Sequence, residues 1–245
     1  MISNISYKLL YLSLSILMAG TLGGWAIVSK LSGQDAASEF FYFGLAIVAI
    51  VFFAQCAVYF LMKERLFFKL IFLALFGLSL VWFMGVLVIP LFWLSVVGLE
   101  IKLAMVLLFI ILCICNLIES FKIFDVKWRG MEDGVRVRKL ERTDNQVNWD
   151  KLVASMRFSP DIYIPGLSRR ASTVLAVIMV LFMLVGLNLR TLFPVFSMFS
   201  VGIPSAIVVS FFFQIIGFNL AQARQVRLLE QEYKIVLCQK SQVAT

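Results

Sequence analysis

The chain contains several long apolar blocks, and one of them, Leu70–Leu99, runs for 30 residues without a charged side chain. An α-helix crosses the core of a bilayer with roughly 20 apolar residues. Inside that core every backbone N–H and C=O group must be hydrogen-bonded within the protein, which a helix achieves on its own. The blocks therefore predict membrane-spanning helices. Composition agrees, because 62% of the residues are hydrophobic and 15% are charged, against about 25% charged residues in soluble domains.

Six blocks have bilayer length, so we expect an all-α polytopic membrane protein with a six-helix transmembrane bundle. The expected spans are about 9–28, 40–61, 70–91, 101–117, 173–189 and 193–218. The segment 90–98 is expected to connect the third span to the fourth, as a loop or as a re-entrant segment. The chain is thereby divided into four spans in 1–120, a loop in 121–171, two spans in 172–221 and a helical tail in 222–245.

Lysine and arginine residues are distributed unequally between the two ends of these spans. Nineteen of the 22 fall on the side that carries both termini and the 121–171 loop, whereas Lys30, Lys102 and Arg190 fall on the other side. Positive residues are enriched on the cytoplasmic side of membrane proteins. We therefore expect a multi-pass protein of a bacterial inner (cytoplasmic) membrane with both termini in the cytoplasm. The same distribution accounts for the net charge of +8, so we expect the lipid bilayer and no nucleic acid as a partner.

The 121–171 loop is expected to form a small cytoplasmic cap. Two segments that alternate apolar and basic residues, 126–129 and 135–138, flank a turn signal and predict a short β-hairpin. Apolar residues at helical spacing then predict an amphipathic helix. Its apolar face consists of Trp149, Leu152, Val153 and Met156. The tail carries a second apolar stripe over 223–236, which is expected to pack on this helix, on a second copy of the protein or on the membrane surface.

Residue types that commonly carry catalysis are scarce in this chain. It has no histidine, which excludes histidine-based acid–base catalysis and the usual zinc ligand sets. Cys113 and Cys115 are separated by one residue, the wrong spacing for a CxxC redox or zinc motif. A membrane-embedded lipid enzyme would have to use Glu100 or Glu119, each at an expected helix end. We therefore expect no enzyme activity, no cofactor and no metal site.

Small residues in the first span indicate close helix packing. Ser15, Ala19 and Gly23 recur at four-residue spacing, and Gly20 with Gly24 forms a GxxxG motif beside them. Small side chains allow the backbones of two membrane helices to approach closely. The partner helix is expected to belong either to this chain or to another protein.

Three uncharged polar residues, Gln55, Asn116 and Gln214, lie within expected spans. Amide side chains in membrane helices commonly form hydrogen bonds with neighbouring helices. They could instead line a polar path for a solute, so both interpretations stay open at this point.

The functional hypothesis that best fits these features is a non-enzymatic membrane protein that acts through protein–protein contacts in the bilayer. Its most specific form is an immunity-type protein that neutralises a pore-forming or membrane-targeting bacterial toxin by docking onto the inserted helices of the toxin. Other partners in this class are a membrane complex or a second copy of the chain. This hypothesis rests on architecture alone. The alternative is a subunit of a small-solute or ion transporter or channel, with Gln55, Asn116 and Gln214 along its path.

Overall fold

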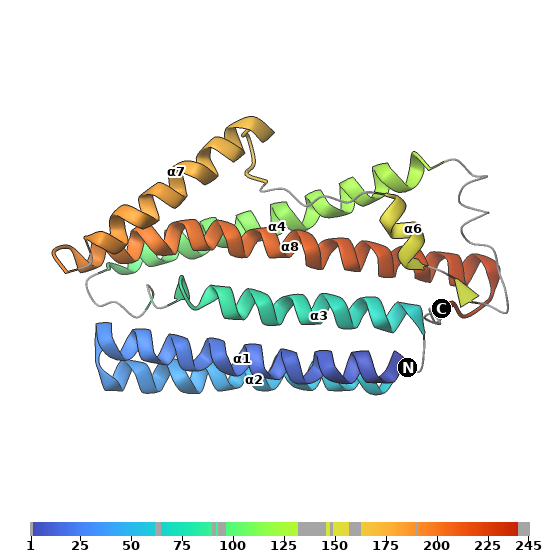
Figure 1. The fold of residues 1–245 in the computed structure, drawn as a ribbon, viewed down its shortest axis with the longest axis horizontal. Coiled ribbons are helices and arrows are strands. Elements are labelled where there is room, and N and C mark those ends of the chain that lie inside the picture. Colours follow the sequence, from blue (N-terminus) through green and yellow to red (C-terminus); the bar gives the residue numbers. More distant parts are fainter. Residues whose placement is uncertain are drawn as a thin grey trace.

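The computed structural model describes residues 2–61, 65–89, 92, 97–131, 146–147, 149–156, 163–189 and 191–239, and these are almost entirely helical (Figure 1). The long helices are α1 (Ile2–Ser32), α2 (Gln34–Leu61), α3 (Leu66–Gly85), α4 (Leu99–Arg129), α7 (Arg169–Asn188) and α8 (Pro194–Tyr233). A short helix, α6 (Trp149–Ser155), is accompanied by two strands of two residues each. Strand β1 (Gln146–Val147) pairs in parallel with β2 (Cys238–Gln239).

Among the residues that the structure describes, five helical segments are long and apolar enough to cross a membrane. They are Tyr7–Lys30, Gln34–Leu61, Leu66–Gly85, Leu99–Arg129 and Phe196–Tyr233. The expected span at 173–189 lies in α7, but the apolar part of α7 identified among the described residues is shorter, Val177–Asn188. The helices thus fit an all-α, membrane-embedded protein, whereas the expected count of six spans is not confirmed.

The long helices form two groups that are joined side by side. In the first group α3 packs against both α1 and α2, which also pack against each other, and in the second α8 packs against α4 and α7. The two groups meet where α3 packs along α8 (Figure 1). At this junction a Cβ atom on Gly77 would lie 2.6 Å from Cγ1 of Ile216, so only glycine permits this close approach of the two helices.

The turn between α1 and α2 consists of a single residue, Gly33. Its φ angle is +89°, in the left-handed region that glycine adopts without steric cost. The backbone N–H of Ala37 already donates to the Gly33 carbonyl at 3.2 Å, so α2 begins at once. The two helices therefore run antiparallel as a tight pair.

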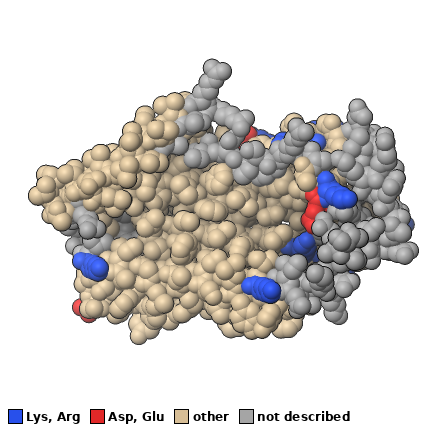
Figure 2. Space-filling model, in the orientation of Figure 1, with Lys and Arg blue, Asp and Glu red and all other residues tan. Residues whose placement is uncertain are grey.

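The two ends of the helix bundle carry different structural elements. Both termini, α6 and the β1–β2 pair lie at one end, and we call it the α6 end; the Gly33 turn and the start of α4 lie at the other (Figure 1). The face drawn in Figure 2 has few charged side chains along the length of the helices, and acidic and basic side chains lie together beside α6. Large apolar side chains such as Phe53, Leu103 and Val174 are exposed on the outside of the helices. This arrangement fits a bilayer around the helices.

Two helix ends differ from the expected boundaries. Helix α3 ends at Gly85 rather than near residue 91, because the backbone N–H groups of Leu87 and Val88 bond three residues back instead of four. Most of the 90–98 connection, and with it the choice between a loop and a re-entrant segment, lies outside the described residues. Helix α4 continues to Arg129, well past the expected end at 117.

The prediction of a β-hairpin in the cap is wrong for its first strand. Residues 126–129 belong to α4, whose buried side chains at its end are Ser120, Phe124 and Trp128. A spacing of four residues is the period of a helix, and the buried face outweighed the local alternation of apolar and basic residues. The second expected strand, 135–138, lies outside the described residues. The helical tail expected over 222–245 is present as far as Tyr233, where α8 ends, whereas Cys238–Gln239 of the same tail form strand β2.

Candidate functional site

The glycines of the GxxxG motif in α1 face the interior of the first helix group. A Cβ atom on Gly20 would lie 3.1 Å from the Cα atom of Phe83 in α3 and equally close to the Trp82 ring. A Cβ atom on Gly24 would overlap the ring of Phe40 in α2. These two glycines thus let α1 pack closely against α2 and α3 of the same chain.

The other small residues of α1 lie on a different face. Ser15 and Ala19 are exposed, and Gly23 is half-buried. A Cβ atom on Gly23 would meet only Cγ1 of Val86, at 3.8 Å, which is an ordinary contact. The structure therefore separates the five small residues into an inward pair, Gly20 and Gly24, and an outward stripe, Ser15, Ala19 and Gly23.

A buried polar cluster lies between α1, α2 and α3. Nε2 of Gln55 donates to the carbonyl of Leu75 at 3.0 Å and to Oγ of Ser79 at 2.9 Å. The hydroxyls of Ser79 and Ser13 are 2.6 Å apart. Oε1 of Gln55 is buried and has no hydrogen-bond partner among the described residues. Gln55 thus links α2 to α3, and the contact between Ser79 and Ser13 extends the cluster to α1.

Asn116 and Gln214 form a second cluster, which links α4 to α8. Nε2 of Gln214 donates to Oδ1 of Asn116 at 2.7 Å. Nδ2 of Asn116 donates to the carbonyls of Leu112 at 2.8 Å and Tyr163 at 3.1 Å. Tyr163 precedes α7, so Asn116 also holds the segment that leads into that helix. The structure brings Asn116 and Gln214 together but leaves Gln55 in the other helix group.

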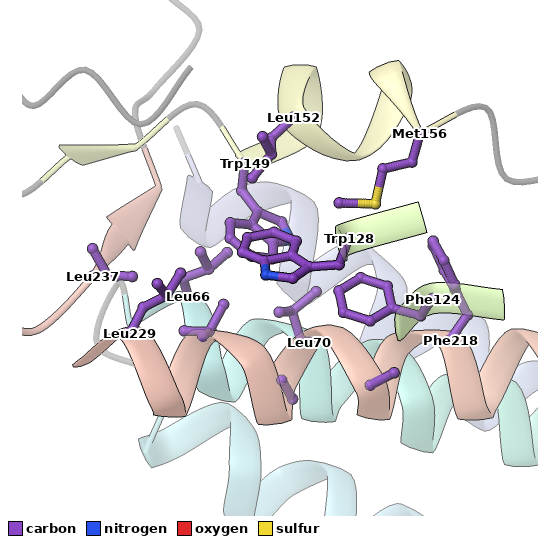
Figure 3. Packing of buried hydrophobic residues seen from close by; sticks show 13 residues of the cluster. Leu66, Leu70, Phe124, Trp128, Trp149, Leu152, Met156, Phe218, Leu229 and Leu237 are labelled. Atoms are coloured by element: carbon purple, nitrogen blue, oxygen red, sulfur yellow. The ribbon is translucent and has the colours of Figure 1, made fainter. Parts of the chain in front are cut away.

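The amphipathic helix expected around Trp149 is present as α6, and its apolar face is turned onto the bundle (Figure 3). Trp149 and Leu152 are fully buried, Met156 is buried and Val153 packs against the same cluster. The rings of Trp149 and Trp128 lie 6.0 Å apart. The cluster also includes residues of α3 and of the α8 tail. Of the tail stripe, Ala223, Val226 and Leu229 are therefore buried against α3 and α6 of the same chain, whereas Tyr233 and Val236 are exposed.

The end of the chain folds back onto the α6 end. Helix α8 stops at Lys234, which has a left-handed conformation. The Leu66 N–H then donates to the Leu237 carbonyl at 2.9 Å, and the Leu237 N–H donates to Oε1 of Glu230 at 3.1 Å. Glu230 is 8% exposed and lies 3.5 Å from Arg227. The buried role of Glu230 was not foreseen, because nothing in the sequence marks where α8 ends and the following segment folds back onto it.

A cavity of about 380 Å³ lies between α3, α6 and α8. Its lining is Leu66, Lys69, Leu70, Leu73, Trp149, Asp150, Val153, Ala154, Phe218, Asn219 and Gln222. Nζ of Lys69 and Oδ1 of Asp150 are 3.9 Å apart. The sequence gives no motif for such a cavity, because its walls come from three helices distant in the chain. The one feature of the sequence that relates to this cavity is that Lys69 and Gln222 lie close to the ends of apolar blocks.

Within the described residues, no group of three or more cysteine, aspartate or glutamate side chains could hold a metal ion. The fold and these clusters define a membrane-embedded, all-helical protein of two helix groups with a small cap at one end. No protein-family model matches the chain, and no curated protein or solved structure shows significant similarity to it.

Proposed function

We propose that the protein is a non-enzymatic, multi-pass membrane protein that acts by contact with another protein inside the bilayer. In this proposal the α6 end lies in the cytoplasm of a bacterial cell. Support comes from the nineteen basic residues assigned to the side that carries both termini and from the common position of the termini and α6 in Figure 1.

The observation that carries the proposal is the outward stripe on α1. Ser15 and Ala19 are exposed, while Gly20 and Gly24 make the close contacts with α2 and α3. Small residues that are not used for packing within the chain leave a shallow surface against which a foreign helix can lie closely. The stripe is therefore the surface that we propose for the partner.

The most specific role of this kind is protection against a pore-forming or membrane-targeting bacterial toxin. Such a toxin inserts apolar helices into the bilayer, where the stripe on α1 would meet them. Binding there would hold the inserted helices apart and prevent them from assembling into a pore. This action requires helix contact and no catalytic group.

The contact is tested by photo-crosslinking in living cells. A photoreactive amino acid is placed at Ser15 or Ala19, and at two exposed control positions, Ala57 in α2 and Ala104 in α4. We expect one polypeptide to be crosslinked from both α1 positions and from neither control. Crosslinking of the same species from all four positions, or of none, would contradict a partner surface on α1.

The role is tested by protection. Cells that produce the protein are challenged with a panel of purified pore-forming toxins, and potassium efflux is measured. We expect protection against one toxin, and loss of that protection when Ser15, Ala19 and Gly23 are all changed to leucine. Full protection by the triple variant would exclude this surface. Absence of protection, together with saturable or ion-selective flux in proteoliposomes, would favour the transporter alternative. Membrane levels of each variant are compared to exclude misfolding.

A further inference from the structure

The cavity between α3, α6 and α8 crosses the boundary between the apolar and charged parts of these helices. On α3 the last charged residue before the long apolar block is Lys69, and on α8 the first charged residue after the apolar block is Arg224. Lys69 and Gln222 line the cavity at this level, and Leu73 and Phe218 line it about one turn farther into the apolar part. In a bilayer this is the level at which lipid head groups meet acyl chains.

The lining matches the two parts of a phospholipid. The side facing the apolar blocks consists of Leu70, Leu73 and Phe218, and the volume of about 380 Å³ lies within the usual range for ligand sites. Asn219 lies at the polar side, and its side chain is partly exposed. The cavity thus offers apolar walls for an acyl segment and a hydrogen-bond donor for a head group.

Lys69 and Asp150 place opposite charges next to each other in this lining. Their charged atoms are 3.9 Å apart, and both side chains are partly exposed, at 32% and 57%. An ion pair between partly exposed side chains contributes about 0–1 kcal/mol, so a head group that carries both opposite charges can replace the contact between Lys69 and Asp150. Figure 2 shows acidic and basic side chains together beside α6, next to the part of this face that has few charged side chains along the helices.

A zwitterionic head group carries the complementary pattern, a phosphate followed by an ammonium group. The phosphate can accept hydrogen bonds from Lys69 and Asn219, and a primary ammonium can donate to the Asp150 carboxylate. An anionic lipid would place a second negative or neutral group against Asp150, and a quaternary ammonium has no N–H to donate. The charge pattern therefore favours a primary ammonium.

We propose that this cavity binds one phosphatidylethanolamine molecule from the surrounding leaflet, with its phosphate at Lys69 and its ammonium group at Asp150. The lipid fills the space between α3 and α6 and holds the cap on the bundle. The proposal is independent of the protein partner on α1.

The test uses native mass spectrometry of the full chain. The protein is reconstituted in vesicles of equal parts phosphatidylethanolamine, phosphatidylglycerol and phosphatidylcholine, and is then released into the spectrometer. We expect one retained phosphatidylethanolamine per chain, in at least about fivefold excess over each other lipid. Equal retention of the three lipids, or retention of none, would overturn the proposal.

Variants separate the two halves of the head-group site. Lys69→Gln should lower retention of all three phospholipids, because each carries a phosphate, whereas Asp150→Asn should abolish only the preference for phosphatidylethanolamine. The matched controls are Lys122→Gln in α4 and Asp35→Asn at the opposite end, exposed residues outside the cavity, and both should behave as wild type. Thermal unfolding in detergent checks that the variants fold. Folded Lys69→Gln and Asp150→Asn variants with wild-type retention would refute the assignment.

Discussion

The indole Nε1 of Trp149 donates a 2.8 Å hydrogen bond to Oε1 of Gln222, which ties α6 to α8. Trp149 is only 1% exposed and also lies against Trp128. One side chain thus supplies both an apolar contact and a polar contact between the cap and the bundle. The amide of Gln222 extends from a helix face that is otherwise apolar, and Trp149 buries it without leaving its oxygen unpaired.

We expect Trp149→Ala to release α6 from the bundle. Removal of a fully buried aromatic side chain costs about 3–5 kcal/mol of unfolding free energy. Limited proteolysis should then cut within 149–155, a segment whose apolar residues Trp149 and Leu152 are buried in the native protein. Trp149→Phe is the control, because it keeps most of the apolar contact and loses only the hydrogen bond, worth about 1 kcal/mol. Equal proteolysis of both variants would show that packing does not hold α6.

Two neighbouring glycines in α1 should respond differently to alanine. Gly24→Ala places a Cβ atom 2.3 Å from Cζ of Phe40, so the buried Phe40 ring or the helix pair must shift, at a cost of about 1–3 kcal/mol. Gly23→Ala meets only Val86 at 3.8 Å and should be tolerated. Unfolding of both variants in a detergent titration measures the difference. Equal stability of the two variants would contradict the observed orientation of α1.

The bond between Gln214 and Asn116 should be detectable as a coupling energy. A double-mutant cycle with Gln214→Leu and Asn116→Leu compares the single changes with the double change. Interhelical hydrogen bonds in membrane proteins average about 0.6 kcal/mol, with a maximum near 1.7 kcal/mol. We expect a coupling in this range from unfolding titrations, and none for the pair Gln214 and Gln55, which lie in different helix groups. A coupling of zero for Gln214 and Asn116 would exclude an energetic role for the 2.7 Å bond.

Glu230 should control the position of the chain end. Glu230→Ala removes the acceptor of the Leu237 N–H, and the unpaired donor costs about 1–3 kcal/mol if it stays buried. The segment 235–239 should therefore detach and become sensitive to carboxypeptidase. Glu230→Gln keeps an oxygen acceptor at the same place and should protect the segment as wild type does. Digestion at the same rate in both variants would argue against the hydrogen bond.

The helical class and most helix positions could be predicted because bilayer solvation leaves few alternatives for a long apolar block. Prediction was weaker where a helix leaves the apolar part. Helix α4 continues for twelve residues past the expected end at 117, because Phe124 and Trp128 pack on residues of α8 and α6 that are about 20 to 100 positions away in the sequence. Local alternation over 126–129 carries no information about those contacts.

The candidate site was predictable by residue type but not by geometry. Gln55, Asn116 and Gln214 are easily recognised as polar residues in apolar surroundings. Which of them bond to one another depends on which helices are neighbours, and a single sequence does not reveal that. Likewise, the five small residues of α1 form adjacent stripes in the sequence, and only the positions of Phe40, Trp82 and Phe83 decide which stripe faces inward.

The central place of α8 has a consequence for how the protein is made. This helix packs against α3, α4 and α7, yet all three precede it in the chain and leave the ribosome before it. The pair formed by α1 and α2 can insert early, and α3 can join it. The face of α3 around Gly77, however, stays without its contact to α8 until Ile216 has been synthesised. The two helix groups can therefore assemble only after α8 has been made, and a chain that is truncated before α8 would lack the helix against which α3, α4 and α7 all pack.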